Sequence, residues 1–285
     1  MLLVPYLSPD RLREIESKGL SGIDACGNGV ITVRGRLLVY RTGMRNKYPD
    51  SKPIKNVYRG DASLVPRALV RIPRSAFYER VSAVRDQIIA YGGSIALSTV
   101  SKALKRLEEE LLIERRRGRI RWLQGDELLA RLAQNYEPPK PSRPPVKAKC
   151  RLPLEAIKQR LVEIERQSRI RIAATGLASV SRYAVMAREQ TLAVYCSEAD
   201  RIFNRFGKPG EIELTEFFAN LELFETQTQF AYFDIRRDQD GFAWASPVQT
   251  YLELMSGDKR ERETAEQIVP DLTDWNRYAE WARDE

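Results

Sequence analysis

Basic and short polar side chains concentrate in one stretch of this chain, and their types and spacing suit the binding of phosphate groups. Residues 96–123 read ALSTVSKALKRLEEELLIERRRGRIRWL. Lysine and arginine neutralise nucleic-acid phosphates, and short polar or basic side chains on one helix face can reach base edges in a groove. The stretch therefore predicts a surface for double-stranded DNA, provided that the surrounding elements position these side chains together.

The first part of this stretch has the apolar spacing of an amphipathic helix. Residues that recur every three or four positions form the expected buried side: Val100, Ala103, Leu104, Leu107 and Leu111. The opposite side, with Thr99 at its edge, carries the candidate base-reading residues Ser98, Thr99, Lys102, Lys105 and Arg106. Either Ser94 or Ser98 is suited to cap the helix, and the pattern does not choose between them.

Beyond Leu112 the pattern changes from a helix to two short strands. Gly118 marks the turn between them, and Ile120 and Trp122 share one face of the second strand. Four arginines flank this turn and are expected to contact phosphates: Arg115, Arg116, Arg117 and Arg119. A helix followed by such a basic hairpin predicts a winged helix-turn-helix. The plain alternative is a solvated surface, since glutamates at positions 108–110 dilute the positive charge.

Composition places the chain among folded globular proteins and removes several kinds of chemistry. Of its 285 residues, 43% are hydrophobic and 30% are charged, which suffices for two or three compact units. Histidine is absent, which excludes histidine-dependent triads and histidine-ligated metals. Cys26, Cys150 and Cys196 lie too far apart to predict disulfides or a CxxC metal site. We expect no metal and no cofactor.

The sequence predicts neither a targeting segment nor a membrane segment. No apolar run approaches the roughly 18 residues that a membrane-spanning helix needs. The start of the chain, MLLVPYLSPDRL, has neither the basic nor the apolar region of a secretory signal. We therefore expect a cytoplasmic protein that has no membrane partner.

Charge and proline content divide the chain near residue 150. Residues 1–150 contain 29 basic and 15 acidic residues, a net charge of +14, whereas residues 151–285 contain 18 and 24, a net charge of −6. A polyanion-binding half joined to a half with another role is the expected result. Six prolines lie within residues 137–153, and proline both removes amide donors and stiffens the chain. We predict a linker over 137–150.

An N-terminal β-rich block is expected before the helical region. Ser8 is suited to cap a short helix that ends before Gly19. Runs at 30–33 and 37–40 should pair as a β-hairpin. The cluster Gly27–Gly29 is interpreted as a turn between strands rather than a phosphate-binding loop, since neither Gly-Lys-Ser/Thr nor a helix follows it.

The remaining patterns complete the predicted organisation. Helices over 63–72 and 82–91 should precede the helix that starts the basic stretch. The second half is expected to contain helices over 153–168, 171–187, 247–255 and 258–269, and strands within 191–196, 211–217 and 230–247. We predict an α+β fold with an N-terminal β-rich block (1–62), a winged helix-turn-helix (63–136), the linker (137–150) and a separate C-terminal α/β domain (151–285).

The acidic residues suggest no catalytic site. A nuclease needs clustered carboxylates with a lysine near a strand end, where they hold a divalent metal ion. The nearest candidates lack such a lysine: Asp24, the pair Asp234 and Arg236, and the pair Glu211 and Glu213. We therefore expect that the protein is not an enzyme.

Several segments, spread over most of the chain, carry a family resemblance. They are GIDACGNGVITV with GRLLVYRTG, SLVPRALVRIP, STVSKALKRLEEELLIERR, AATGLASVSRYA and FAWASPVQTYLELMSGDKRERETAEQIV. Their order resembles that of the AbiEi-type antitoxins of type IV toxin–antitoxin, or abortive infection, systems.

The resemblance implies a winged-helix repressor that shuts down its own operon by binding repeated operator sequences in double-stranded DNA. It also implies a C-terminal domain that opposes a nucleotidyltransferase-like toxin without stably binding it. By position, the DNA-contacting element would be Ser98–Arg106 together with Arg115–Arg119. Pro247, Tyr251 and Arg260 lie in the most family-like segment of the C-terminal half, to which no residue role transfers.

Two other functions stay open at this point. One is a winged-helix regulator whose C-terminal domain senses a ligand and which has no toxin. The other is a nucleic-acid enzyme in which residues 1–62 or 151–285 form a degenerate nuclease-like domain. A neighbouring toxin gene would separate the antitoxin from the ligand sensor.

Overall fold

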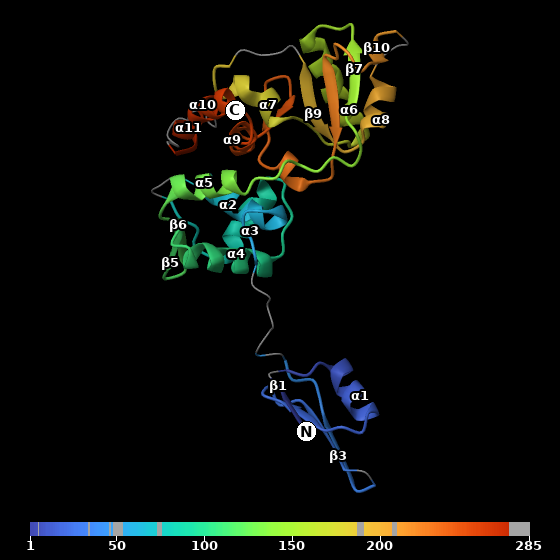
Figure 1. Ribbon diagram of the computed structural model, residues 1–285, viewed down its shortest axis with the longest axis vertical. Helices are drawn as coiled ribbons and strands as arrows, with labels where there is room; N and C mark the ends of the chain where they lie inside the picture. Colours follow the sequence, from blue (N-terminus) through green and yellow to red (C-terminus); the bar gives the residue numbers. More distant parts are fainter. Residues whose placement is uncertain are drawn as a thin grey trace. The chain divides into compact units, whose positions relative to one another are not determined.

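The chain folds into two compact units, Met1–Pro53 and Ile54–Glu285 (Figure 1). The structure is a computed structural model, and it describes residues 1–4, 6–33, 35–45, 47, 54–72, 76–186, 191–206 and 210–273. Both units combine α-helical structure with β-sheet, so the fold is α+β, as predicted. Within these ranges, no helix has the length and apolar content that crossing a membrane requires.

The N-terminal unit is a four-stranded sheet with one helix packed on it. In spatial order the strands are β1 (Leu2–Val4), β2 (Gly22–Asp24), β3 (Gly29–Val33) and β4 (Leu37–Arg41). β1 and β2 are parallel, and the other neighbours are antiparallel. The helix α1 (Pro9–Ser17) connects the two parallel strands and packs Leu12 and Ile15 against Val30 of β3.

The local features predicted for this unit are confirmed. The Ser8 hydroxyl accepts the Arg11 amide at 3.3 Å and caps α1. Gly19 follows the end of this helix with a φ of +64°, a conformation that glycine adopts without a steric penalty. β3 and β4 form the expected hairpin, and Gly27 and Asn28 lie between β2 and β3.

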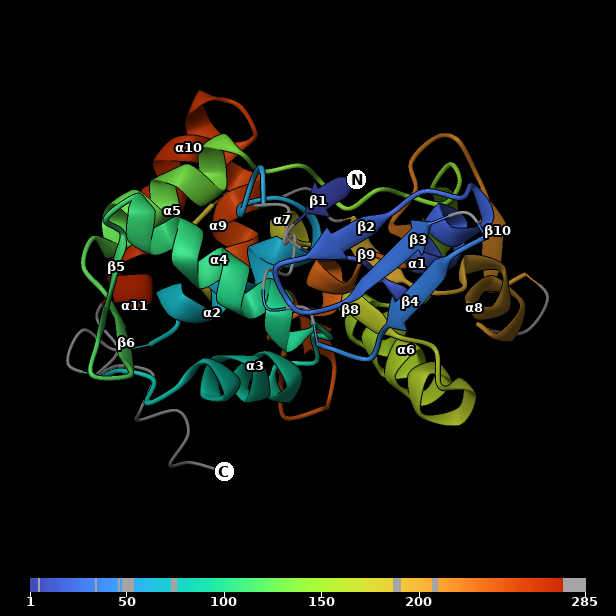
Figure 2. The same cartoon turned by 90° about the horizontal axis from the view of Figure 1, so that it is seen from below.

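The second unit begins with helices and an antiparallel strand pair, all of which were predicted. The elements are α2 (Leu64–Val70), α3 (Val81–Ala90), α4 (Leu97–Glu109), β5 (Ile113–Arg116) and β6 (Arg119–Trp122). Figure 2 shows the strand pair beyond one end of α4. Ahead of α3, Tyr78 pairs with Ile120 of β6 through backbone hydrogen bonds of 2.8 and 2.7 Å. The pair is thereby extended by a third, very short strand.

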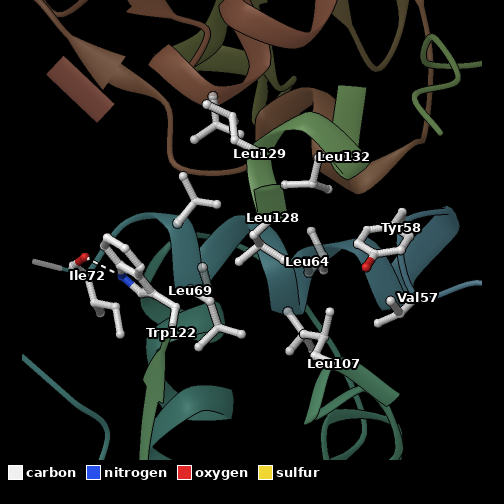
Figure 3. Packing of buried hydrophobic residues seen from close by; sticks show 14 of the residues in the cluster. Val57, Tyr58, Leu64, Leu69, Ile72, Leu107, Trp122, Leu128, Leu129 and Leu132 are labelled. Atoms are coloured by element: carbon white, nitrogen blue, oxygen red, sulfur yellow. Dashed lines mark hydrogen bonds between the residues drawn. The ribbon is translucent and has the colours of Figure 1, made fainter. Parts of the chain in front are cut away.

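One apolar core joins these elements to helices from the end of the described chain. The additional helices are α5 (Gly125–Gln134), α9 (Pro247–Met255), α10 (Lys259–Glu266) and α11 (Val269–Thr273). Leu64, Leu107 and Leu128, from α2, α4 and α5, are fully buried in this core (Figure 3). Leu252 of α9 and Ile268 belong to the same cluster. Figure 1 shows α5 between α2 and α9, and it packs against both.

A five-stranded mixed sheet forms the rest of the second unit. In spatial order the strands are β10 (Ile212–Leu214), β7 (Val146–Cys150), β11 (Leu221–Glu225), β9 (Leu192–Cys196) and β8 (Ile172–Ala174). β11 and β9 are parallel, and the remaining neighbours are antiparallel. The helices α6 (Leu154–Ser168) and α8 (Ala199–Arg205) cover one face. Tyr232 and Ala243 pack against Tyr195 on the other.

The division of the chain differs from the predicted one. Val146–Cys150, assigned to the linker 137–150, forms β7, which pairs with both β10 and β11. In place of a separate domain over 151–285, α9–α11 complete the core of α2–α5. The first boundary follows Pro53 rather than residue 62, since Val57 and Tyr58 also lie in this core. Proline content and charge report local stiffness and solvation, whereas domain boundaries depend on which apolar faces meet.

Two segments of the C-terminal half have structures that differ from the prediction. Residues 171–187, predicted to be helical and described up to 186, start as β8, and their helical part is limited to α7 (Gly176–Ser179) and a 3₁₀ turn. Residues 230–247 contain the two-residue strands β12 (Arg236–Arg237) and β13 (Ala243–Trp244) around the expected hairpin turn. β7 and β11 were not predicted, because such short central strands show little periodicity of their own.

Replacing Leu252 by alanine should destabilise the helices on both sides of the shared core. Leu252 is fully buried there, and deleting a buried leucine side chain costs about 2–5 kcal/mol. Hydrogen exchange should therefore become faster in α2 and α4 as well as in α9. The control Ile89→Ala, at a side chain that is 52% exposed, should change the free energy of unfolding by less than about 0.5 kcal/mol. Faster exchange confined to α9–α11 would contradict the shared core.

Candidate nucleic-acid interface

The helix α4 turns one side toward the core and leaves a polar side exposed. Its fully buried residues are Val100, Ala103, Leu104 and Leu107, as predicted. On the other side, Ser98, Lys105 and Arg106 are exposed, and Thr99 and Lys102 are partly buried. Leu111, predicted on the buried side, is 67% exposed, because the helix ends at Glu109 and Leu111 has a φ of +59°. Leu112 is buried in its place.

The start of α4 leaves backbone donors available to a ligand. Neither Ser94 nor Ser98 caps the helix, because the N-cap residue is Ala96, which has no side-chain acceptor. Ser98 lies in the first turn instead. Within the part of the chain that the structure describes, the amides of Leu97 and Ser98 have no acceptor. The partial positive charge at this helix end favours a negatively charged group there.

The hairpin of β5 and β6 closes with a two-residue turn, Arg117 and Gly118. Their φ angles are +53° and +83°, and Arg116 pairs with Arg119 directly before and after the turn. Two positive φ angles define a type I′ turn, whose twist matches that of paired strands. The turn therefore places Arg116 and Arg117 at the exposed tip of the hairpin.

Buried contacts attach this hairpin to the helices. Ile120 and Trp122 lie on the inner face of β6, as predicted, and the Trp122 indole N–H donates to the Ile72 carbonyl oxygen at 3.0 Å (Figure 3). Gly125 lies so close to this indole that a Cβ atom there would be 2.6 Å from a ring carbon. The hairpin therefore has a fixed position relative to α4.

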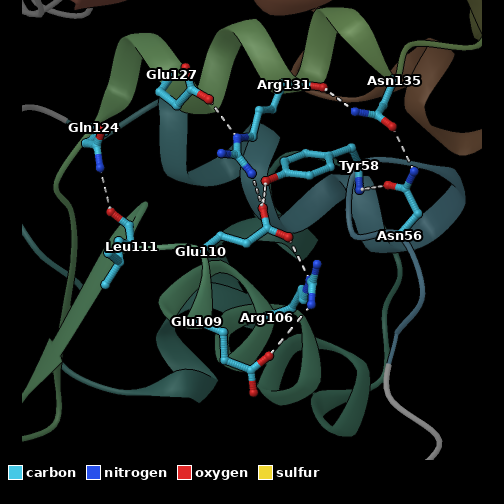
Figure 4. Close-up of polar contacts among 10 residues, drawn as sticks. All are labelled: Asn56, Tyr58, Arg106, Glu109, Glu110, Leu111, Gln124, Glu127, Arg131 and Asn135. Carbon is cyan, nitrogen blue, oxygen red and sulfur yellow. Dashed lines mark hydrogen bonds and ion pairs between the residues drawn. The ribbon is translucent and has the colours of Figure 1, made fainter.

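Two of the predicted contact residues are engaged by acidic neighbours. The Arg106 Nε–H donates to Glu110 at 2.6 Å (Figure 4), and an Arg115 guanidinium nitrogen lies 2.6 Å from Glu108. Both guanidinium groups are partly exposed, and ion pairs in contact with solvent stabilise a fold by about 1 kcal/mol or less, so a DNA phosphate could displace them. In the free protein, however, the glutamates hold both guanidinium groups.

The other predicted cations are less restrained. Across the described ranges, Lys102, Arg116 and Arg117 take part in no ion pair, and Lys105 lies 4.0 Å from Glu109. Positive charge that no acidic side chain compensates therefore lies on α4 and at the hairpin tip.

Sequence reasoning missed three residues of this surface. Arg119 lies 4.3 Å from the centroid of the Phe77 ring, a cation–π contact that places Phe77 beside the hairpin. Arg121 is exposed on the same face of β6 and pairs with Glu114 at 2.7 Å. Ser101 is exposed on α4. The alternation of β6 and the helical period could have found Arg121 and Ser101, whereas Phe77 depends on a long-range strand pairing.

Glu110 joins α4 to α5 and to the start of the second unit. Its carboxylate lies 2.8 Å from Arg131 of α5, also pairs with Arg106, and accepts a short hydrogen bond from the Tyr58 hydroxyl (Figure 4). Burial by itself would raise the pKa of the Glu110 carboxyl. The hydrogen bonds and charges of Tyr58, Arg106 and Arg131 have a larger effect in the opposite direction, so this pKa lies below its usual value. The ionised form is therefore favoured by folding.

The acidic residues that were considered as metal ligands form hydrogen bonds or ion pairs with other groups of the protein. The Asp24 carboxylate accepts three backbone amides and the Asn28 side chain at 2.7–2.8 Å, which outweigh burial and lower its pKa. Asp234 is buried at 2.8 Å from Arg71, and burial raises its pKa to about 6 against the Arg71 charge. Glu213 pairs with Arg151. Among the described residues, no three histidine, cysteine, aspartate or glutamate side chains are grouped to hold a metal ion.

Comparisons with protein-family models, with curated proteins and with solved structures gave no significant match to this chain.

Glu110→Gln should destabilise the second unit by about 1.5–3 kcal/mol at pH 7, the range for hydrogen bonds to charged groups. Folding lowers the pKa of Glu110 from its usual value of 4.5. The ionised carboxylate therefore contributes fully to the stability of the fold above about pH 4.5, and this contribution is lost as the pH falls through the folded-state pKa. The difference between wild type and variant in urea unfolding should therefore shrink below about pH 4.5. Glu109→Gln, at a side chain that is 53% exposed, serves as the control and should have little effect. A constant difference across this pH range would contradict the role of the carboxylate.

Proposed function

We propose that this chain is a sequence-specific DNA-binding transcriptional regulator, in which residues 63–136 form a winged helix-turn-helix. One observation carries the proposal: the exposed polar face of α4 lies beside a hairpin whose tip, Arg116 and Arg117, has no acidic partner in the described ranges. In such an arrangement the polar helix face can lie in a major groove, while the unpaired basic groups beside it contact the phosphate backbone that borders the groove.

The order of the elements supports the proposal. Along the chain it runs α2, the short strand at Tyr78, α3, α4, β5 and β6, and the Tyr78 strand pairs with β6. This order of helices and strands is typical of winged-helix DNA-binding folds. In helix-turn-helix proteins the second helix of the motif enters the major groove, and here that helix is α4.

The contacts of the free protein divide the candidate residues by role. Ser98, Thr99 and Lys102 lie in the first turns of α4 and would meet base edges. Arg116 and Arg117 at the hairpin tip would meet phosphates. Arg106 and Arg115 would first have to leave Glu110 and Glu108, so we expect smaller contributions from them.

Replacing hairpin and helix residues should therefore have different effects on DNA binding. Arg116→Ala or Arg117→Ala should weaken the binding of operator and random DNA about equally, and should lower the slope of log K against log salt by about one. Lys102→Ala should instead reduce the preference for operator DNA, since a good base contact contributes roughly 1–3 kcal/mol of discrimination. Binding isotherms on both DNAs across a salt series measure each effect.

Arg201→Ala on α8 is the control, because Arg201 is also an exposed arginine but lies outside this surface, where it pairs with Glu198. It should leave both affinities unchanged. Unchanged binding in both hairpin variants would restore the interpretation of this region as a solvated surface. Equal losses on both DNAs for Lys102→Ala would assign α4 to positioning rather than to base recognition.

We further propose the narrower role of an autorepressing antitoxin that opposes a nucleotidyltransferase-like toxin without a stable complex. The support is the ordered set of segments that resembles AbiEi-type antitoxins. In the most family-like segment, Pro247 is buried and Tyr251 belongs to the shared core, whereas Arg260 on α10 is exposed. Arg260 is therefore better placed than the other two to meet a target directly.

Co-expression tests this role. A nucleotidyltransferase-like toxin encoded beside this gene should arrest growth, and this chain should restore it without co-purifying with the toxin. The double variant Arg116→Ala/Arg117→Ala should still restore growth while losing repression of a reporter placed behind the operator. If this chain represses the reporter but does not restore growth, the antitoxin role is contradicted and a ligand-sensing regulator is the better description.

A further inference from the structure

A cavity of about 460 Å³ lies inside the second unit, next to α2. Its walls come from three segments that are distant in the sequence: residues 58–67, residues 136–140 after α5, and residues 227–230 before the β12–β13 hairpin. The size is in the range of small-ligand sites. Five charged residues line the cavity: Arg59, Asp61, Arg67, Glu137 and Lys140. Arg59 pairs with Glu137 at 2.8 Å, and Asp61 accepts a hydrogen bond from the Gln229 side chain at 2.5 Å.

Among the charged residues of this lining, Arg67 is the buried one. The residue is 3% exposed, and its Nη1 donates to the Gln249 side chain at 2.8 Å. Its Nε has no hydrogen-bond partner, and among the described residues no carboxylate oxygen lies within ion-pair distance of the guanidinium group. Burial lowers the pKa of Arg67 to about 10, which leaves it charged at neutral pH. A buried cation without a counter-ion is strongly unfavourable.

The charge of the buried Glu253 carboxyl acts on Arg67, but its two oxygens are occupied by other donors. Its Oε1 accepts the Tyr195 hydroxyl at 2.9 Å and the Gln249 amide at 2.8 Å. Its Oε2 accepts the Leu177 backbone amide at 3.0 Å. Gln249 therefore separates Glu253 from Arg67, and the guanidinium side that faces the cavity gains no direct contact from this acid.

A second donor lines the same cavity. The Tyr136 hydroxyl accepts a hydrogen bond from the Gln249 amide at 2.8 Å, and no described residue accepts the proton of Tyr136 itself. Lys140, also in the lining, is exposed and takes part in no ion pair within the described ranges. Of the charged lining residues, Arg67 and Lys140 thus have no acidic partner within the described ranges, and together with the Tyr136 hydroxyl they match a ligand rich in acceptors.

We propose that this cavity is a binding site for a small anion that carries a phosphate or carboxylate group. The Arg67 guanidinium is its buried counter-charge, the Tyr136 hydroxyl donates to it, and Lys140 lies at the solvent side. Phe230, whose ring centroid lies 4.9 Å from the Arg67 guanidinium carbon, holds that group from another side. The site is separate from the α4 and hairpin surface and does not depend on DNA binding.

Isothermal titration calorimetry of the full chain, with sodium phosphate, pyrophosphate and succinate at constant ionic strength, tests the site. We expect saturable binding of one anion per chain for at least one probe, and a comparison of the phosphate and succinate arms identifies the preferred group. Arg67→Gln should abolish this binding. Lys140→Glu should weaken the affinity for the anion by only about fivefold, because water and salt screen the charge at this exposed position.

Three controls keep the result specific. Lys259→Glu makes the same charge change on an exposed lysine that does not line the cavity, and binding should be unchanged. If circular dichroism shows that Arg67→Gln does not fold, the two lysine variants test the site instead: Lys140→Glu should weaken anion binding, and Lys259→Glu should not. The absence of saturable binding for all three probes, or equal weakening by both lysine variants, would overturn the proposal. Loss of binding in Arg116→Ala/Arg117→Ala with retention in Lys140→Glu would also overturn it, because the anion would then bind at the hairpin.

Discussion

The packing of α5 between α2 and α9 is the contact on which the rest of the second unit depends. α5 follows the β5–β6 hairpin directly and contributes Leu128, Leu129 and Leu132 to the common core. Burial of apolar side chains is the main favourable term in folding, at roughly 25 cal/mol per Å². The same burial holds the hairpin and α4 on one side and joins them to the C-terminal elements on the other. The polar face of α4 is therefore supported by residues more than a hundred positions away.

Buried polar contacts add a second constraint at the same junction. Arg71 at the end of α2 lies 2.8 Å from Asp234, and both side chains are 4% exposed. Arg67, one helical turn earlier, meets Gln249 of α9. Buried charges are costly unless they are paired, so such contacts select one way of fitting the parts together more than they increase stability. Arg67 lacks a direct acidic partner, and this difference from Arg71 is the reason to assign it a ligand.

The arrangement of charge around α4 follows from its position in the sequence. The basic residues occupy its first three turns, and the acids at 108–110 occupy its end, where they pair with Arg106, Arg115 and Arg131. These pairs neutralise the side of the helix that faces α5 and the hairpin base. The helix start and the hairpin tip keep positive charge that no acidic side chain in the described ranges compensates.

The sequence by itself determined the elements whose residues interact locally. The buried side of α4 follows from apolar spacing, the β5–β6 hairpin from alternation and Gly118, and the α1 cap from Ser8 and Pro9. Each depends on neighbours within a few residues. Leu111 was misplaced, because the helix ends two residues before it, and a period alone does not specify where a helix stops.

Only the tertiary structure decided which faces meet. β7 lies within a proline-rich, basic segment and becomes a strand because β10 and β11 pair with it from both sides. The shared core, the ion pairs that hold Arg106 and Arg115, and the cavity at Arg67 all join residues that are far apart in the chain. Contacts of this kind arise from the complementary shapes of faces that form only after the local elements exist, so no local pattern in the sequence encodes them.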